Sequence, residues 1–297
     1  MKKNIFAFIK ILSLFVSVSL LFSSCKYNIG EGFARLMKVE ERATNLRILD
    51  HEPVLNAITD SEEYDVLVIT DVHFGNENHG KNGPRREEDF FAHLEEASSG
   101  VALIDSVKFV ICMGDIAEHG YDDEFKRFNA VIKTWFDAKG IPIYHVVGNH
   151  DLYNSGWKNW AANNYPNTSF YKFETPSFSW YFLDSASGTL GWYQYDELDG
   201  HMRRDDKKKL VFTHIPVYAE DNLYFVMQNT EERNLLISTC AKTGVQLFVD
   251  GHTHKDRTSD FGKFIERNVP GFLEKSGYGV VHINEANDTC SIKVVYF

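Results

Sequence analysis

The chain has 297 residues, of which 43% are apolar, with 31 basic against 42 acidic side chains. This is enough apolar material for one large domain or two small ones, and it excludes disordered, collagen-like and disulfide-scaffold proteins. Residues 1–24 contain three lysines and no acidic residue, so the chain after this leader has 28 basic and 42 acidic side chains, a net charge of −14 that argues against a nucleic acid partner.

The leader has the order of an export signal. Lys2 and Lys3 precede an apolar run over residues 11–22 that is broken only by serines and is too short to span a bilayer as a helix. The stretch that ends at Cys25, Phe22-Ser23-Ser24-Cys25, resembles the lipobox of bacterial lipoproteins, in which the cysteine is acylated. We therefore expect a lipoprotein signal peptide at 1–24 and a protein held at the bacterial cell envelope, outside the cytoplasm, by lipid on Cys25. An ordinary signal peptide is the alternative.

The apolar pattern then alternates between short strand-like runs and helical stretches. Seven runs rich in β-branched or aromatic residues predict strands at 65–70, 108–113, 143–147, 179–183, 210–213, 246–249 and 280–283. The clearest helix follows Asp122 and Asp123, which we expect to cap it, and ends at Gly140. Alternating strands and helices predict an α/β fold, and continuously apolar strands predict sheets covered on both faces.

The cysteines are scattered and do not form a Cys-x-x-Cys pair. A zinc ribbon is therefore not expected. Cys112 is expected to be a buried thiol within a strand. Whether Cys240 and Cys290 pair is left open by the sequence.

Five polar motifs stand where predicted strands end, the place where open α/β sheets carry their sites. Each of them alone is as well explained by a turn or a cap. Together they supply two aspartates, an asparagine and histidines, the nitrogen and oxygen donors that bind two metal ions. They are Asp71-Val72-His73, Gly114-Asp115, Gly148-Asn149-His150-Asp151, Thr213-His214-Ile215-Pro216 and Gly251-His252-Thr253-His254.

In this order the motifs resemble the signature of the calcineurin-like metallophosphoesterase superfamily, over residues 64 to about 254. The resemblance implies a four-layer α/β/β/α sandwich, a single domain at 61–297 after an extension at 25–60. It also implies two divalent ions, for which the donor set fits Mn, Fe or Zn. One metal would be held by Asp71, His73 and His254, the other by Asn149, His214 and His252, with Asp115 bridging both. A carboxylate can span two ions about 3.5–4 Å apart.

The resemblance leaves His150 without a metal and implies a catalytic role for it, assisting the leaving oxygen or stabilising the transferred group. Glu118 matches the position of a carboxylate that orients this imidazole, and a solvated loop acid is the alternative. The chain departs from protein phosphatases of the superfamily, which carry an Arg that grips phosphate where this chain reads 116–120 as Ile-Ala-Glu-His-Gly. It also has no tyrosine at Glu118, where purple acid phosphatases bind iron.

The sequence therefore predicts an envelope-anchored enzyme that hydrolyses small phosphoesters at a binuclear metal centre. Two such ions activate water for attack on phosphorus. A non-catalytic, lipid-anchored metal- or ligand-binding protein with the same fold is the alternative, and a nuclease of the superfamily is disfavoured by the −14 charge. Monoester or diester specificity and the oligomeric state stay open.

Overall fold

The computed structural model describes residues 39–76, 85–98, 100–220 and 223–297. The predicted leader and Cys25 therefore lie outside the described residues. Within the described part of the chain, no helix combines the length and the apolar character that crossing a bilayer requires.

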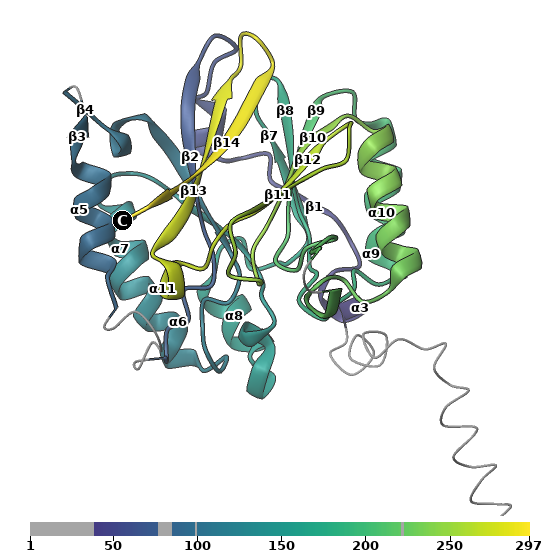
Figure 1. Ribbon diagram of the computed structural model, residues 1–297, viewed down its shortest axis with the longest axis horizontal. Coiled ribbons are helices and arrows are strands. Elements are labelled where there is room, and N and C mark those ends of the chain that lie inside the picture. Colours follow the sequence, from purple (N-terminus) through teal and green to yellow (C-terminus); the bar gives the residue numbers. More distant parts are fainter. Residues whose placement is uncertain (1–38, 77–84, 99, 221–222) are drawn as a thin grey trace, which may run out of the picture.

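Two β-sheets form the middle of the molecule (Figure 1). The first has five strands, in which β2, β5 and β6 run parallel and β13 and β14 are added antiparallel at one edge. Because parallel strands end at the same edge of a sheet, the segments that follow β2, β5 and β6 emerge together. The strands in sheet order are β14 (Thr289–Tyr296), β13 (Gly277–Asn284), β2 (Glu63–Ile69), β5 (Val107–Met113) and β6 (Ile143–Val146).

The second sheet has seven strands, and its central four, β8, β9, β10 and β12, are parallel. Its strands in sheet order are β1 (Arg47–Ile48), β7 (Tyr171–Glu174), β8 (Phe178–Phe182), β9 (Lys208–Phe212), β10 (Val245–Asp250), β12 (Ile265–Asn268) and β11 (Arg257–Asp260). A short hairpin, β3 (Ala97–Ser98) with β4 (Val101–Ala102), stands apart. All seven predicted strands are present, with ends shifted by at most three residues.

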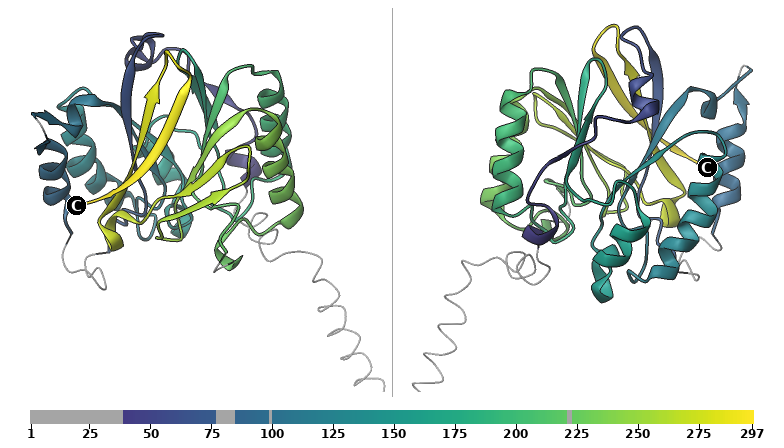
Figure 2. Two further views of the ribbon diagram at one scale, coloured as in Figure 1. Left: turned by 45° about the horizontal axis from the view of Figure 1, so that its top comes forward. Right: turned by 180° about the vertical axis from the view of Figure 1, so that it is seen from behind.

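Helices cover the outer faces of both sheets (Figure 2). On the five-stranded side lie α5 (Glu87–Glu95), α6 (Asp122–Phe128), α7 (Thr134–Asp137) and α8 (Trp157–Asn163), and on the seven-stranded side α9 (Trp192–Arg204) and α10 (Thr230–Lys242). Short helical turns are α3 (Val39–Arg42), α4 (Pro53–Asn56), α11 (Phe272–Lys275), η2 (Leu103–Ser106), η3 (Asn129–Lys133), η4 (His150–Ser155) and η5 (Leu223–Phe225).

Side chains that alternate along each strand build three core layers. In β2, Val66 and Val68 pack between the two sheets, whereas Leu67 and Ile69 pack under the helices. In β9, Phe212 faces the other sheet and Val211 faces α9 and α10. Buried residues on both faces of both sheets confirm the expected four-layer α/β/β/α sandwich in a single domain.

The helix predicted after Asp122 is interrupted. Tyr121 is the cap and Asp122 and Asp123 are the first helical residues, so the expected aspartate caps are wrong. Glu124, in the first turn, accepts the backbone N–H of Tyr121 instead. The π-helical η3 joins α6 to α7, and Gly140, at φ +73°, follows the last turn as predicted.

Residues 39–60, expected as an extension before the domain, share its cores. Val39 and Ala43 pack under α9, and Leu49 and Leu55 pack between the sheets. The backbone N–H of Leu49 donates to Lys172 in β7. The three cysteines in the described residues are free thiols, and Cys112 is fully buried as expected.

Candidate metal centre

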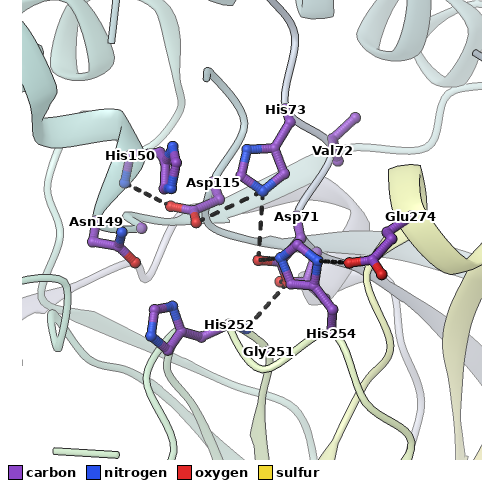
Figure 3. Close-up of polar contacts among 12 residues, drawn as sticks. Asp71, Val72, His73, Asp115, Asn149, His150, Gly251, His252, His254 and Glu274 are labelled. Carbon is purple, nitrogen blue, oxygen red and sulfur yellow. Dashed lines mark hydrogen bonds and ion pairs between the residues drawn. The ribbon is translucent and has the colours of Figure 1, made fainter. Parts of the chain in front are cut away.

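The five motifs meet at one end of the sandwich, where the parallel strands of both sheets end. Asp71 and His73 follow β2, Asp115 follows β5, and Asn149 follows β6 in the first sheet. The second sheet contributes three histidines after β9 and β10. Figure 3 shows the side chains from the two sheets pointing toward one another. The residues from the second sheet are His214, His252 and His254.

The backbone at these turns is unusual. Five of the seven predicted ligands have positive φ angles between 48° and 64°, in the left-handed region that residues other than glycine rarely adopt: Asp71, His73, Asp115, His252 and His254. Such strain persists only where the surrounding structure holds it, and it is concentrated at functional sites. Gly148 makes the turn possible, because a Cβ there would lie 2.2 Å from Asp115 Oδ1.

The first group of donors surrounds Asp71. Its Oδ1 atom lies 3.1 Å from Nε2 of His254 and 3.9 Å from Nε2 of His73. Its Oδ2 atom accepts hydrogen bonds from the Thr70 hydroxyl and from the backbone N–H of His252. One carboxylate oxygen is thereby held by the protein, and the other points at two imidazoles.

The second group surrounds His214. Its Nε2 atom lies 3.3 Å from Asp115 Oδ2 and 3.2 Å from Asn149 Oδ1. His252 joins this group, with its ring centroid 5.1 Å from that of His214. His214 Nδ1 contacts the backbone carbonyl of Met113 at 2.8 Å.

Asp115 lies between the two groups. Its Oδ2 atom is 3.9 Å from Nε2 of His73 on one side and 3.3 Å from Nε2 of His214 on the other. Its Oδ1 atom accepts the backbone N–H of His150 at 2.8 Å. This placement is the one required of a carboxylate that bridges two ions.

The electrostatics of the site favour positive charge at its centre. Burial by itself lowers the pKa of both His254 and His214, but Asp71 and Asp115 outweigh it and raise these pKa values to about 10 and about 9. The same histidines hold the pKa of the Asp71 and Asp115 carboxyls well below their usual range, against the effect of burial. Burial and His214 lower the pKa of His252 to about 4, which keeps this ring in the neutral form that binds metals.

Buried polar atoms without hydrogen-bond partners indicate that the site can bind metal ions. Asp71 Oδ1 and His73 Nε2 are buried and make no hydrogen bond with another described residue. Buried polar atoms without partners are costly unless something else pairs with them. Nitrogen and oxygen donors in two groups that share one carboxylate fit two divalent ions, with Asp71, His73 and His254 around one and Asn149, His214 and His252 around the other.

His150 lies beside the donors at a cavity of about 360 Å³. Its Nδ1 atom contacts the backbone carbonyl of Glu118 at 2.9 Å, and its ring packs on Tyr153 at 4.6 Å between centroids. Phe225, Lys255 and Arg257 also line the cavity.

The sequence match that identifies the family covers all the residues of the two donor groups. The calcineurin-like phosphoesterase family matches residues 64–256, which is more than half of the chain and includes all seven predicted ligands. The chain belongs to this family. It is a hydrolase, as the motifs predicted.

Relatives of this phosphoesterase are distant. A protein of Fibrobacter succinogenes named as a probable cyclic nucleotide phosphodiesterase is 24% identical over 212 residues, 69% of this chain and 78% of that protein. A dimetal phosphatase from Danio rerio has a TM-score of 0.59 at 17% identity, covering 75% of this chain and 93% of that one. GAP50, described as the anchor in the inner membrane complex of Plasmodium, has a TM-score of 0.56 at 14% identity, with coverages of 79% and 84%. These structures share the fold.

One contact in the phosphoesterase site differs from the sequence prediction. The Glu118 carboxylate was expected to orient His150, but its Oε2 atom lies 2.8 Å from Nδ1 of His73. The contact to His150 Nδ1 comes from the backbone carbonyl of Glu118, while the Glu118 carboxylate lies within 4.8 Å of a ring nitrogen of His150. The turn after Asp115 points the side chain toward the first group of donors and the carbonyl toward the cavity, a geometry that residue spacing does not reveal.

Sequence reasoning missed several residues that support the phosphoesterase site. Asp151 accepts the backbone N–H groups of Ala117 and Gly148 and so ties the second motif to the third. Burial, helped by Asp115, raises the pKa of its carboxyl to about 7. Arg85 donates to the carbonyls of Val72 and His73. The available signal was its place in a basic pair, Arg85-Arg86, that follows Gly83-Pro84.

Further supporting residues come from beyond the matched region. Glu266 of β12 accepts the backbone N–H groups of Val217 and Tyr218, just after the His214 motif. Asn268, at the end of β12, donates to Asp250 and to the carbonyl of Gly251. The sequence carried no signal for these contacts, because the residues lie in polar segments without a motif.

Proposed function

We propose that this phosphoesterase hydrolyses small phosphoesters at a centre of two divalent metal ions. The observation that carries the proposal is the convergence of seven donors from both sheets in two groups that share Asp115. Bound ions supply positive charge to the phosphoryl oxygens and make water acidic enough to act as a nucleophile at neutral pH.

The protein's own contribution to the reaction is positioning and proton transfer. Asp71 and Asp115 are held in place by backbone N–H groups, so the donors need little rearrangement when the site is loaded. With His150 Nδ1 donating to the Glu118 carbonyl, its Nε2 is the nitrogen that gives or takes a proton. Because His150 lines the cavity, it is placed to protonate the leaving oxygen.

Small phosphodiesters are the substrates that we place first. The relative from Fibrobacter succinogenes is named as a probable cyclic nucleotide phosphodiesterase. Phe225 is exposed at the cavity and its ring lies 5.5 Å from that of His252, so an aromatic group such as a base has a surface to pack on. The cavity of about 360 Å³ has room for a compact ester, and the −14 charge works against long nucleic acids.

A hydrolysis panel tests the proposal. Nitrophenyl phosphate, bis-nitrophenyl phosphate, cyclic nucleotides and phospholipid head groups are each supplied with Mn, Fe(II) or Zn after chelator treatment. We expect turnover that needs added metal and is greatest for diesters. A protein that binds two metals but hydrolyses nothing in the panel would contradict the proposal and favour the metal-binding alternative.

We also propose that the enzyme is anchored at the bacterial envelope by lipid on Cys25. The order of charge, apolar run and small residues before Cys25 supports this location. Wild type is expected to incorporate labelled fatty acid and to fractionate with membranes, whereas Cys25→Ser is expected to do neither. Equal labelling of both proteins would contradict acylation at this residue.

A further inference from the structure

Both histidines of the first group are backed by a carboxylate. His254 Nδ1 hydrogen bonds with Oε2 of Glu274 at 2.8 Å, and His73 Nδ1 lies 2.8 Å from Oε2 of Glu118 in an ion-pair contact. In each ring the other nitrogen, Nε2, points at Asp71 Oδ1. Figure 3 shows the His254 ring between Asp71 on one side and Glu274 on the other.

Glu274 is held in this place by the first motif itself. It belongs to α11, whose backbone N–H groups at Phe272 and Leu273 donate to the carbonyls of Thr70 and Asp71, at 2.8 and 3.2 Å. The backbone that carries Asp71 therefore also carries the helical turn that presents Glu274. The residue lies beyond the family match at 64–256.

The second group is built differently. His214 Nδ1 contacts a neutral group, the carbonyl of Met113. In the described part of the chain, the candidate metal-binding cluster that contains His214 and His252 includes one carboxylate, the shared Asp115. Among the described residues, carboxylates of four residues lie within 4 Å of a ring nitrogen of His73 or His254, whereas only that of Asp115 is found within 4 Å of a ring nitrogen of His214. The additional three are Asp71, Glu118 and Glu274.

We propose that Glu274 is a positioning residue which, together with Glu118, makes the Asp71–His73–His254 site the tighter of the two metal sites. A carboxylate behind an imidazole fixes the tautomer with the proton on Nδ1, aims Nε2 at the ion and makes that nitrogen a stronger donor. Loss of such a partner typically costs about 10–100-fold in metal affinity. The proposal rests on the two-metal centre proposed above, but not on hydrolysis.

Glu274 also has a second partner, which provides a matched control. Its Oε1 atom pairs with Lys275 Nζ at 2.8 Å, and both side chains are partly exposed. If Glu274 served only this surface ion pair, Lys275→Met and Glu274→Gln would have the same effect. If Glu274 acts on His254, Lys275→Met leaves metal binding unchanged.

The test measures metal binding directly. The full chain is equilibrated with chelator-buffered Zn or Mn, and bound ions per chain are counted over a range of free metal concentrations. Wild type is expected to fill in two steps, and His254→Asn identifies the step that belongs to the first site. We expect Glu274→Gln and Glu118→Gln to move that step by about 10-fold or more and to leave the other step in place.

Three results would overturn the proposal: a wild type whose two sites fill in one step, a Glu274→Gln curve that overlays wild type, or a Glu274→Gln curve that moves both steps equally. Melting of the metal-free variants shows that they are folded. Because hydrolysis is not measured, a chain that binds as expected but hydrolyses nothing contradicts the proposed function alone.

Discussion

Asp115 is the residue on which both halves of the metal centre depend. It is almost fully buried and reaches His73 with the same oxygen that faces His214. Its other oxygen is held by the backbone of His150, so the carboxylate cannot swing toward either side without losing a hydrogen bond. The geometry makes both sites depend on the same carboxylate.

Replacing Asp115 by Asn is expected to empty both sites together. The amide has the shape of the carboxylate but lacks the charge that holds two cations about 3.5–4 Å apart. Because Asp115 would itself be a ligand, metal affinity should fall by more than the 10–100-fold that is typical when a hydrogen-bond partner of a metal ligand is lost. Elemental analysis after gel filtration measures the loss. Two tightly bound metals and normal turnover in this variant would rule out the bridging role.

His150 is not a predicted metal ligand, although its ring packs edge-on against that of His73 at 4.8 Å between centroids. His150→Asn is therefore expected to keep both metals and to lower the rate. Positioned acids contribute about 10²–10⁴-fold, and their contribution grows with the need of the leaving oxygen for a proton. The variant should therefore lose far more activity on an alkyl ester than on a nitrophenyl ester. Equal losses would indicate charge stabilisation in place of acid catalysis.

Among the secondary-structure elements, β6 carries a buried histidine that predicts a pH dependence of folding. His145 Nδ1 donates to the carbonyl of Tyr165, and burial lowers the pKa of the ring to about 4. Folded His145 stays neutral, whereas the unfolded chain takes up its proton below about pH 6.5. The stability that the neutral ring contributes is thus present above pH 6.5 and lost as the pH falls toward 4.

The prediction is a difference between two pH profiles. Between pH 7 and pH 4, in chelator, wild type should lose about 3 kcal/mol more of its free energy of unfolding than His145→Gln. Urea unfolding at each pH measures this. His51→Gln, at an exposed ring, is the control. Parallel profiles for wild type and His145→Gln would contradict the assignment.

The short C-terminal elements do more for the site than their length suggests. β12 supplies Glu266 and Asn268, which hold the backbone after His214 and before His252. The turn α11 supplies Glu274 and is bonded to the backbone of Thr70 and Asp71. These elements fasten the loops of one sheet to those of the other at the metal centre.

At the scale of the whole molecule, the donors come from both sheets, so bound metal links the two halves of the sandwich. Ligands that bind only the folded chain stabilise it, by about 2.7 kcal/mol per site at a free concentration 100 times the dissociation constant. We expect urea unfolding in buffered metal to show this gain over chelator. Asp115→Asn should lose most of it. Equal stability with and without metal, when analysis shows two bound ions, would contradict this link.

Much of this architecture was predictable because its signals are local. Strands β2 and β5 end in apolar runs, at 66–69 and 109–113, because both faces of these segments are covered, and a motif follows each strand directly. The order of motifs predicted the side chains that converge, because parallel strands end at one edge.

The edge strands and the supporting carboxylates were decided only by the tertiary structure. Strand β11 is short and polar, and β14 alternates without a strong apolar run, so each depends on the neighbour that it pairs with. Glu274 is 20 residues from His254 in the sequence and belongs to no motif. The Glu118 carboxylate lies next to His73 because of the path of its loop. Which nitrogen a carboxylate meets depends on distances across the folded chain, and residue spacing does not encode those distances.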